Sequence, residues 1–448
     1  MQGEKKETVF DRIYSQKVRL TLLLFQLILL YLPTLMLFSI QTDNGPIPAS
    51  LCYFFSLVFV PYLLVHFRQL KWPPWYLTGF FVFVLVWAAI CMPEYGLSKS
   101  VLHWAFGLYL LVMVPNVGKD FSKGEWVRLL EIGACTFAVL HFGYMIIHRE
   151  YLLTMLRGYF DGSGNGYFAS LIPSLTRGGR HLDATWLALG AYFVRGKKKA
   201  VYVTYAVLFS FVSSSRVGIV AIGMLILWSL FYDPMYRLRL KNLKWYVLYA
   251  IVIVALLVFS GSAQGLLSRI SIQVPPPAQI LGIVSQQEVQ EMSEGLMSTG
   301  FLSGRDVLWN MVPPAIAERP VGYGVGNAIR VFRMYYGFDS YEDVMHNVFL
   351  QLLMDEGVIG AVWFVGMCIA FFVSQFKQRP RFFAAPIAGY FLTYLVLSLV
   401  QFHGGEALMQ FVLAISLVQP QLLFGEPKNA LENTPPLPDD KAGEEAAP

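Results

Sequence analysis

The chain has 448 residues, of which 56% are hydrophobic and only 14% are charged, with a formal net charge of +5 at pH 7. A soluble globular protein carries about 25% charged residues, so the composition excludes an ordinary soluble domain and indicates a polytopic membrane protein. Roughly 20 apolar residues span a bilayer. We therefore predict an all-α integral membrane protein with about 12 transmembrane helices, near residues 20–40, 47–65, 74–92, 100–115, 127–147, 182–194, 200–213, 217–232, 245–260, 357–375, 382–400 and 407–424.

Both ends of the chain are predicted to lie in the cytoplasm. Charges of both signs precede the first apolar run and no small-residue cleavage site follows them, so the first helix is expected to be retained. Residues 425–448 are expected to form a disordered cytoplasmic tail. The positive-inside rule places the basic connections on the cytoplasmic side, namely 66–72, 118–128, 195–199, 237–244 and 377–381.

Two predicted outer segments are long enough to do more than connect helices. One, at about 148–181, interrupts the first nine helices, which occupy residues 1–260. The other, 261–356, separates the ninth helix from the last three helices in residues 357–424. Long connections in compact proteins are usually functional or disordered. Because the first segment is rich in glycine, aromatic residues and charges, we favour a functional role for it.

The predicted outer side uses arginine almost exclusively as its cation, with Lys99 as the exception. Orientation requires positive charge alone, whereas a planar guanidinium can grip phosphate or carboxylate with two hydrogen bonds. We therefore expect a polyanionic ligand on this side. The alternative for any single arginine is contact with lipid phosphates or with carboxylates in the loops. The ten outer arginines are Arg149, Arg157, Arg177, Arg180, Arg216, Arg269, Arg305, Arg319, Arg330 and Arg333.

Arg216 gives the strongest indication of an anion site. It follows three serines, precedes the apolar run 217–232, and has no carboxylate nearby in sequence. A serine can cap the helix that starts there, so that the helix N-terminus and the guanidinium would face the same anion. Arg305 is expected in the first turn of another helix, because Ser303 and Asp306 have the spacing of a capping box.

His346 is the candidate general base. It begins a helical pattern in which Leu350 and Leu353 share its face, and Gly357 interrupts this pattern before the tenth span. Asp343, Asp355 and Glu356 lie near enough in sequence to influence the charge of His346. Neutral imidazole is the commonest general base. A surface or capping role is the alternative. The sequence contains no DxD or ExD pair that would hold a metal ion, so arginines are expected to act in place of a metal if the donor is phosphorylated.

Together these features resemble the O-antigen ligases, whose superfamily includes O-antigen polymerases and protein O-oligosaccharyltransferases. The resemblance rests on the twelve-helix plan with one large loop before the tenth helix, and on three motifs. These are "SSSR" ending in Arg216, "SGRDVLW" with Arg305 before "ERPVGYGVGN", and "HNVFLQLLMDEGVIG" beginning at His346. The resemblance implies a GT-C-like glycosyltransferase of the bacterial inner membrane, with its active site facing the periplasm.

The implied reaction is transfer of O-antigen glycan from undecaprenyl pyrophosphate to a hydroxyl of lipid A-core, without metal, nucleotide or other cofactor. By position, His346 would be the general base, and Arg216, Arg305 and Arg180 would bind the pyrophosphate. Direct displacement by the acceptor hydroxyl would invert the anomeric carbon. The expected partners are these two lipid-linked substrates and membrane lipids, and no nucleic acid is expected.

Three alternatives remain open at this stage. A polymerase would use a second lipid-linked glycan as acceptor, and a protein O-oligosaccharyltransferase would use a serine or threonine. A short tail after the last helix favours the ligase over the second of these. A transporter of lipid-linked sugars is the non-enzymatic alternative. Transporters commonly carry ionisable residues at mid-membrane and internal repeats, whereas here the charges cluster outside the helices.

Overall fold

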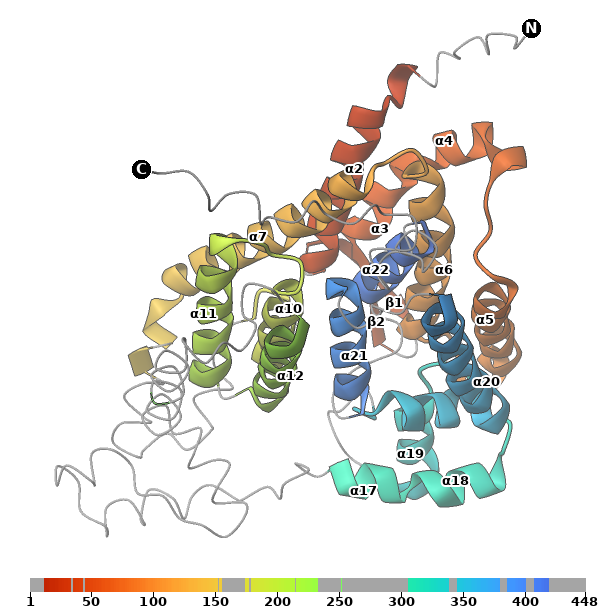
Figure 1. Cartoon of the computed structure of the whole chain (residues 1–448). Helices are drawn as coiled ribbons and strands as arrows, with labels where there is room; N and C mark the ends of the chain where they lie inside the picture. Colours follow the sequence, from red (N-terminus) through yellow and green to blue (C-terminus); the bar gives the residue numbers. More distant parts are fainter. Residues whose placement is uncertain are drawn as a thin grey trace, which may run out of the picture.

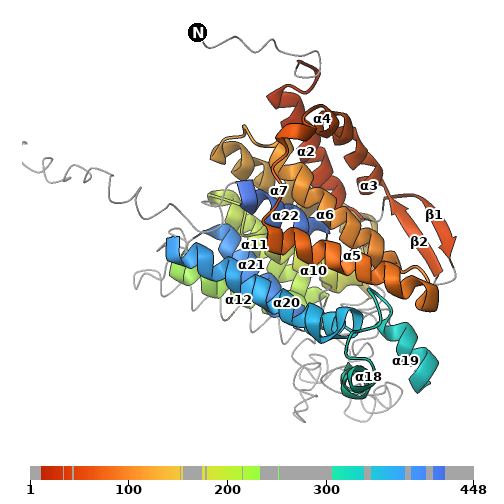
Figure 2. The same cartoon turned by 90° about the vertical axis from the view of Figure 1, so that its right-hand side faces the viewer.

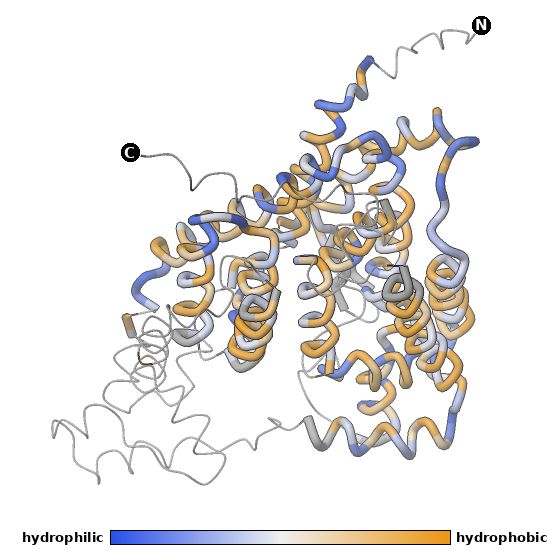
Figure 3. Tube along the Cα trace, viewed as in Figure 1, coloured by the Kyte–Doolittle hydropathy of each residue, from blue (hydrophilic) through white to orange (hydrophobic). Residues whose placement is uncertain are grey.

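The computed structural model is a bundle of helices whose long members lie side by side, with shorter helices across one end (Figures 1 and 2). Hydrophobic residues dominate the long helices, whereas connections such as 66–72 are hydrophilic (Figure 3). The structure describes residues 12–33, 35–42, 45–151, 153–154, 174–176, 179–213, 215–232, 251, 305–337, 345–378, 385–399 and 407–418.

The N-terminal part departs from the two helices predicted at 20–40 and 47–65. The first helix ends at Tyr31, just before Pro33, and a hairpin of two antiparallel strands follows. Proline lacks the N–H that a helix needs and disfavours helical backbone at the preceding residue, which explains the early end. The elements here are α2 (Gln16–Tyr31), β1 (Met36–Thr42), β2 (Gly45–Ser50), α3 (Leu51–Ser56), η1 (Leu57–Phe59), α4 (Val60–Val65) and η2 (Phe67–Gln69).

The next three helices agree with the predicted membrane spans. They are α5 (Trp75–Tyr95), α6 (Lys99–Val117) and α7 (Lys123–Ile147). These three and residues Val348–Val373 are the 4 helices in the described part of the chain that are long and apolar enough to cross a membrane. The span predicted at 245–260 lies outside the described residues except for Ile251, as does the tail at 425–448, so the count of twelve remains a prediction.

The remaining helices of the bundle match predicted spans in position. A helical pattern was predicted from His346, with Gly357 interrupting it before the tenth span. The structure has a helix from Val348 with a kink at Gly357, where φ is 68°. These helices are α10 (Gly179–Gly190), α11 (Lys197–Val212), α12 (Arg216–Tyr232), α20 (Val348–Gln378), α21 (Pro386–Ser398) and α22 (Ala407–Val418).

Helices α12 and α21 are antiparallel neighbours, so the start of each lies beside the end of the other. Trp228, late in α12, packs against Gly389, early in α21. The start of α12 and the end of α21 therefore share one end of the bundle. The starts of α10 and α20 lie at this same end, which is the lower end in Figure 1. The basic connection 195–199, which follows α10, lies at the opposite, upper end (Figure 1).

Three short helices of the large outer loop form a layer across the lower end: α17 (Arg305–Asn310), α18 (Val312–Glu318) and α19 (Ala328–Tyr336) (Figure 1). They bury a second apolar cluster, separate from the main core of the bundle. Leu308, Val312 and Phe332 of the layer pack there with Tyr95 of α5 and Met354 of α20. The layer is thus attached to the two helices that flank it.

A glycine loop, residues 320–327, connects this layer to the kink in α20. Gly322 and Gly324 have positive φ angles of 83° and 85°, and the N–H of Gly324 donates to the carbonyl of Asp355 at 2.7 Å. Tyr323 N–H donates likewise to Met354. The kink frees carbonyl groups of α20, and the loop satisfies them. From the sequence, this loop could be a plain turn or a place where backbone passes close to another segment. The structure shows the second, because the loop backbone lies against the backbone of α20 at Asp355 and Gly357.

Gly322→Ala is expected to destabilise the protein by about 2 kcal/mol or more, because alanine would occupy left-handed backbone. Its Cβ would also lie 2.4 Å from the backbone nitrogen of Gly357. The melting temperature of the detergent-solubilised protein measures this. Gly143→Ala is the matched control, since a Cβ there meets nothing within 4 Å and the residue is inside α7. Equal melting temperatures for the two variants would contradict the packing described here.

Candidate active site

All four predicted site residues lie at or just before the start of a helix. Arg180 is the second residue of α10, and Arg216 and Arg305 are the first residues of α12 and α17. His346 lies two residues before α20. These helix starts lie at the lower end of the bundle (Figure 1). The side chains of Arg216 and Arg305 lie outside what the structure describes, so their placement here is that of the backbone.

The starts of α10 and α12 contact each other directly. His181 Nδ1 lies 3.2 Å from Ser215 Oγ, which in turn accepts a hydrogen bond of 3.1 Å from the N–H of Gly218. Ser215 therefore caps α12, as the serine pattern predicted. The two helices approach closely, because a Cβ on Gly218 would lie 2.6 Å from that of Ala184. Arg180 and Arg216 thus lie at two adjacent helix N-termini, and the dipoles of both helices favour an anion there.

Asp183 anchors the start of α10. Its carboxylate is fully buried and accepts hydrogen bonds from the N–H groups of Leu175 (2.9 Å) and Thr176 (3.0 Å). On the other side, His141 Nε2 of α7 lies 3.4 Å from Asp183 Oδ2. A buried carboxylate with this many partners holds the chain in one arrangement. Asp183 stands one turn after Arg180 and so fixes the backbone that carries it.

His346 has an unusual backbone conformation. Its φ is 54°, and it is the one residue other than glycine with positive φ in the described part of the chain. Such backbone is disfavoured for residues with a Cβ and persists where neighbouring contacts enforce it. The side chain is half-buried. Strain of this kind is found most often at functional sites.

Contacts on both sides of His346 enforce this conformation. Before it, Met345 donates its N–H to Gln351 Oε1 (3.0 Å) and accepts at its carbonyl from Trp309 Nε1 (2.9 Å). After it, Asn347 Oδ1 caps α20 by accepting from the N–H of Phe349 at 3.0 Å. Asn347 Nδ2 also donates to the carbonyl of Leu399, at the end of α21 (3.0 Å).

Trp309 also links the histidine segment to α17. It lies four residues after Arg305, so one turn of α17 separates the arginine from the bond to Met345. The structure thus brings the predicted residues together as two pairs of segments, those of Arg180 with Arg216 and those of Arg305 with His346.

The sequence match to known proteins falls on this region. Residues 201–365 match the family model described as O-antigen ligase. This segment belongs to the O-antigen ligase superfamily. The match confirms the resemblance and contains Arg216, Arg305 and His346, whereas Arg180 precedes it. The O-antigen ligase family covers ligases and polymerases, which are glycosyltransferase-like enzymes. A comparison with curated proteins finds none that matches the chain.

Two of the outer arginines in the O-antigen ligase segment hold the fold together. Arg319 Nη1 lies 2.7 Å from Glu94 Oε2, and its guanidinium stands 5.4 Å from the ring centres of Tyr95 and Tyr323. Burial works to lower the pKa of Arg319, but the hydrogen bond and charge of Glu94 raise it overall. Arg330 donates to the carbonyl of Tyr95. The alternative of pairing with a carboxylate is therefore correct for Arg319.

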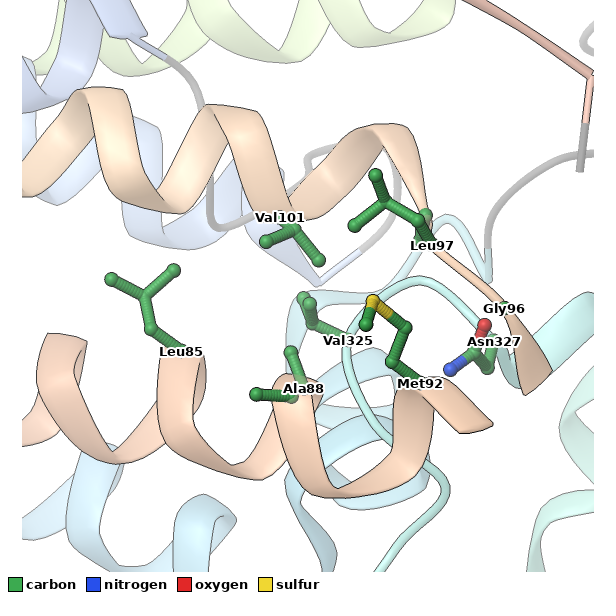
Figure 4. A pocket seen from close by; sticks show the side chains of 10 residues that line it. Leu85, Ala88, Met92, Gly96, Leu97, Val101, Val325 and Asn327 are labelled. Atoms are coloured by element: carbon green, nitrogen blue, oxygen red, sulfur yellow. The ribbon is translucent and has the colours of Figure 1, made fainter. Parts of the chain in front are cut away.

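A small apolar cavity lies beside the glycine loop (Figure 4). It has a volume of about 90 Å³ and lies between α5, α6 and the loop, with Ala88, Met92 and Val325 in its wall. Its lining contains no charged residue. The cavity does not match the polyanionic ligand that the outer arginines predict.

The two acidic residues that follow His346 in the sequence, Asp355 and Glu356, are both buried. The hydrogen bonds of the Asp355 side chain go to Gln351 and to the N–H of Gly326. Glu356 is fully buried, and neither of its carboxyl oxygens has a hydrogen-bond partner among the described residues. Sequence reasoning missed Gln351 and Trp309, because neither carries a catalytic motif.

Proposed function

We propose that the protein is an O-antigen ligase, which transfers O-antigen glycan from undecaprenyl pyrophosphate to a hydroxyl of lipid A-core. One observation gives this proposal its strongest support. The segment that matches the O-antigen ligase family holds His346 in enforced, strained backbone, at the same end of the bundle where α12 begins with Arg216.

In the proposed reaction His346 is the general base. It accepts the proton of the acceptor hydroxyl as the hydroxyl oxygen attacks the anomeric carbon. As this new bond forms, the bond between the anomeric carbon and the pyrophosphate oxygen breaks, so the anomeric configuration is inverted. The histidine afterwards releases the proton to water. A positioned general base contributes about 10² to 10⁴ in rate.

The leaving group is a lipid pyrophosphate that gains negative charge as the bond breaks. Arg180, Arg216 and Arg305 stabilise this charge in the proposal, and each well-placed donor is worth on the order of 3 kcal/mol. The N-termini of α10 and α12 add positive potential at the same place. These groups take the part that a metal ion plays in other phosphate chemistry, so we propose that transfer is metal-independent.

We further propose that the lower end of the bundle faces the periplasm across the inner membrane. The positive-inside rule supports this orientation, because basic connections such as 195–199 lie at the upper end. In that connection Arg195 pairs with Glu131 at 2.8 Å, and Lys198 lies 3.6 Å from the same carboxylate. The lipid-linked donor and lipid A-core would then both reach the site from the outer leaflet.

The test is transfer by the purified protein in detergent, with undecaprenyl-pyrophosphate glycan, lipid A-core and EDTA. The expected product is glycan attached to lipid A-core, identified by mass. Lengthening of the donor would instead establish a polymerase, and glycan on a serine or threonine a protein O-oligosaccharyltransferase. Movement of the donor between vesicle leaflets without transfer would establish a transporter. Loss of transfer in EDTA would show that metal independence is wrong.

A further inference from the structure

We propose that Gln351 and Asp355 are positioning residues for His346, which connect its backbone to the glycine loop through one continuous line of hydrogen bonds. This inference rests on the proposed function, in which His346 is the base. Neither residue reaches the substrates in the proposal. Their role is to keep the imidazole where the acceptor hydroxyl will lie.

Gln351 makes a hydrogen bond with each end of its amide. Its Oε1 accepts from the N–H of Met345 at 3.0 Å, and its Nε2 donates to Asp355 Oδ2 at 2.8 Å. A primary amide is suited to this place because it accepts and donates at once. The same Asp355 oxygen accepts from the N–H of Gly326 at 2.9 Å. The line of bonds therefore runs from Met345 through two side chains to the glycine loop.

The line follows one face of the first turns of α20. Asn347, Gln351 and Asp355 are spaced four residues apart, so they lie on the same side of the helix. Asn347 bonds to Leu399, Gln351 to Met345, and Asp355 to Gly326. This polar face ends at the kink at Gly357. It thus connects the neighbours of His346 to both α21 and the glycine loop.

The burial of Asp355 suggests that this arrangement has a purpose beyond holding the fold. The residue is 2% exposed, and a buried carboxylate is costly unless its hydrogen bonds are made. Apolar side chains of similar size often stabilise a core as well or better. His346 supplies the reason, because left-handed backbone at a residue with a Cβ needs neighbouring contacts to persist. Without the hydrogen bond that Met345 N–H donates to Gln351, Met345 and then His346 can relax toward an ordinary conformation.

The test exchanges the two functional groups. Gln351→Glu places two carboxylates within hydrogen-bond distance, so it is expected to lower kcat by about 10²-fold, as expected for a catalytic group displaced by about 1 Å. The KM for the donor should change little, because the arginines are untouched. The double variant Gln351→Glu with Asp355→Asn keeps an acceptor for Met345 and restores a carboxylate–amide pair. It should recover kcat to within about tenfold of wild type, a coupling that a double-mutant cycle measures.

Two further variants separate positioning from folding. Gln351→Met removes both hydrogen bonds without adding charge, so it should also lower kcat. This variant replaces Gln351→Glu in the test if Gln351→Glu does not fold. Gln26→Met is the matched control, because Gln26 in α2 is fully buried and donates to the carbonyl of Cys52 at 3.1 Å. It should keep wild-type kcat. If Gln351→Met is folded and has wild-type kcat, or if a folded double variant recovers nothing, the inference is wrong.

A second readout needs no transfer activity. Diethylpyrocarbonate modifies accessible imidazoles, and its rate at His346 can be followed by mass spectrometry of the purified protein. We expect that rate to change by about threefold or more in Gln351→Glu, because local opening exposes the side chain, and to return to the wild-type value in the double variant. An unchanged rate in every variant would overturn the inference even if wild type is active. Failure of wild-type transfer would count against the proposed function alone.

Discussion

His346→Asn is expected to remove transfer activity while the protein stays folded, with kcat lower by about 10² to 10⁴-fold. Asparagine is the matched replacement, because it tolerates the left-handed backbone that His346 adopts, with φ 54°, and cannot act as a base. The loss should therefore come from the missing imidazole. Steady-state transfer rates and the KM for the donor measure it.

The melting temperature of His346→Asn should stay close to that of wild type. His346→Ala is the comparison, because alanine has no side chain that hydrogen-bonds locally in left-handed backbone and should melt earlier. Folded His346→Asn protein with wild-type kcat would show that this histidine is not the base.

Arg216→Ala is expected to lower kcat/KM by about 10²-fold or more, since one well-placed donor to the leaving group is worth on the order of 3 kcal/mol. Arg216→Lys should recover only part of this loss, because an ammonium cannot make the two parallel hydrogen bonds of a guanidinium. Arg305→Ala should behave in the same way. The double variant should lose less than the product of the two single losses, because groups that act on one leaving group are not additive.

Arg195→Ala is the control for charge and fold. Its side chain is 58% exposed and pairs with Glu131. The connection 195–199, to which it belongs, lies at the upper end of the bundle (Figure 1). The partner of Arg195, Glu131, is only 11% exposed, so some loss of melting temperature is expected, but kcat/KM of the folded protein should stay near wild type. Equal losses for Arg195→Ala and Arg216→Ala would mean that net positive charge, and not a site at the lower end, supports the reaction.

Local signals predicted several helix starts correctly. Ser215 caps α12 and α17 begins at Arg305, because capping depends on side chains within one turn. Ser303, the predicted cap of α17, lies outside the described residues. The first span was placed wrongly. There Pro33 ends the helix inside an apolar pattern that continues past it, and hydrophobic periodicity alone does not predict such a break.

Sequence motifs identified the candidate site residues, but they did not predict how these residues are arranged in space. The contacts His181–Ser215 and Trp309–Met345 join residues that are 34 and 36 positions apart, and Arg319 meets a carboxylate 225 positions away. A pattern within a few neighbouring residues cannot predict contacts between residues so far apart in the sequence. The bond from Met345 to Gln351 depends on left-handed backbone at His346, which hydrophobic periodicity does not predict.

In the proposed site, the helix starts at the lower end surround a lipid-linked pyrophosphate. Photo-crosslinking measures this with an undecaprenyl-pyrophosphate analogue whose photoreactive group lies next to the phosphates. Mass spectrometry then identifies the labelled peptides. We predict labels on the peptides that contain Arg180, Arg216, Arg305 and His346, and competition by unlabelled donor. Labels that compete with donor but fall on the connection 195–199, at the opposite end of the bundle, would contradict the account.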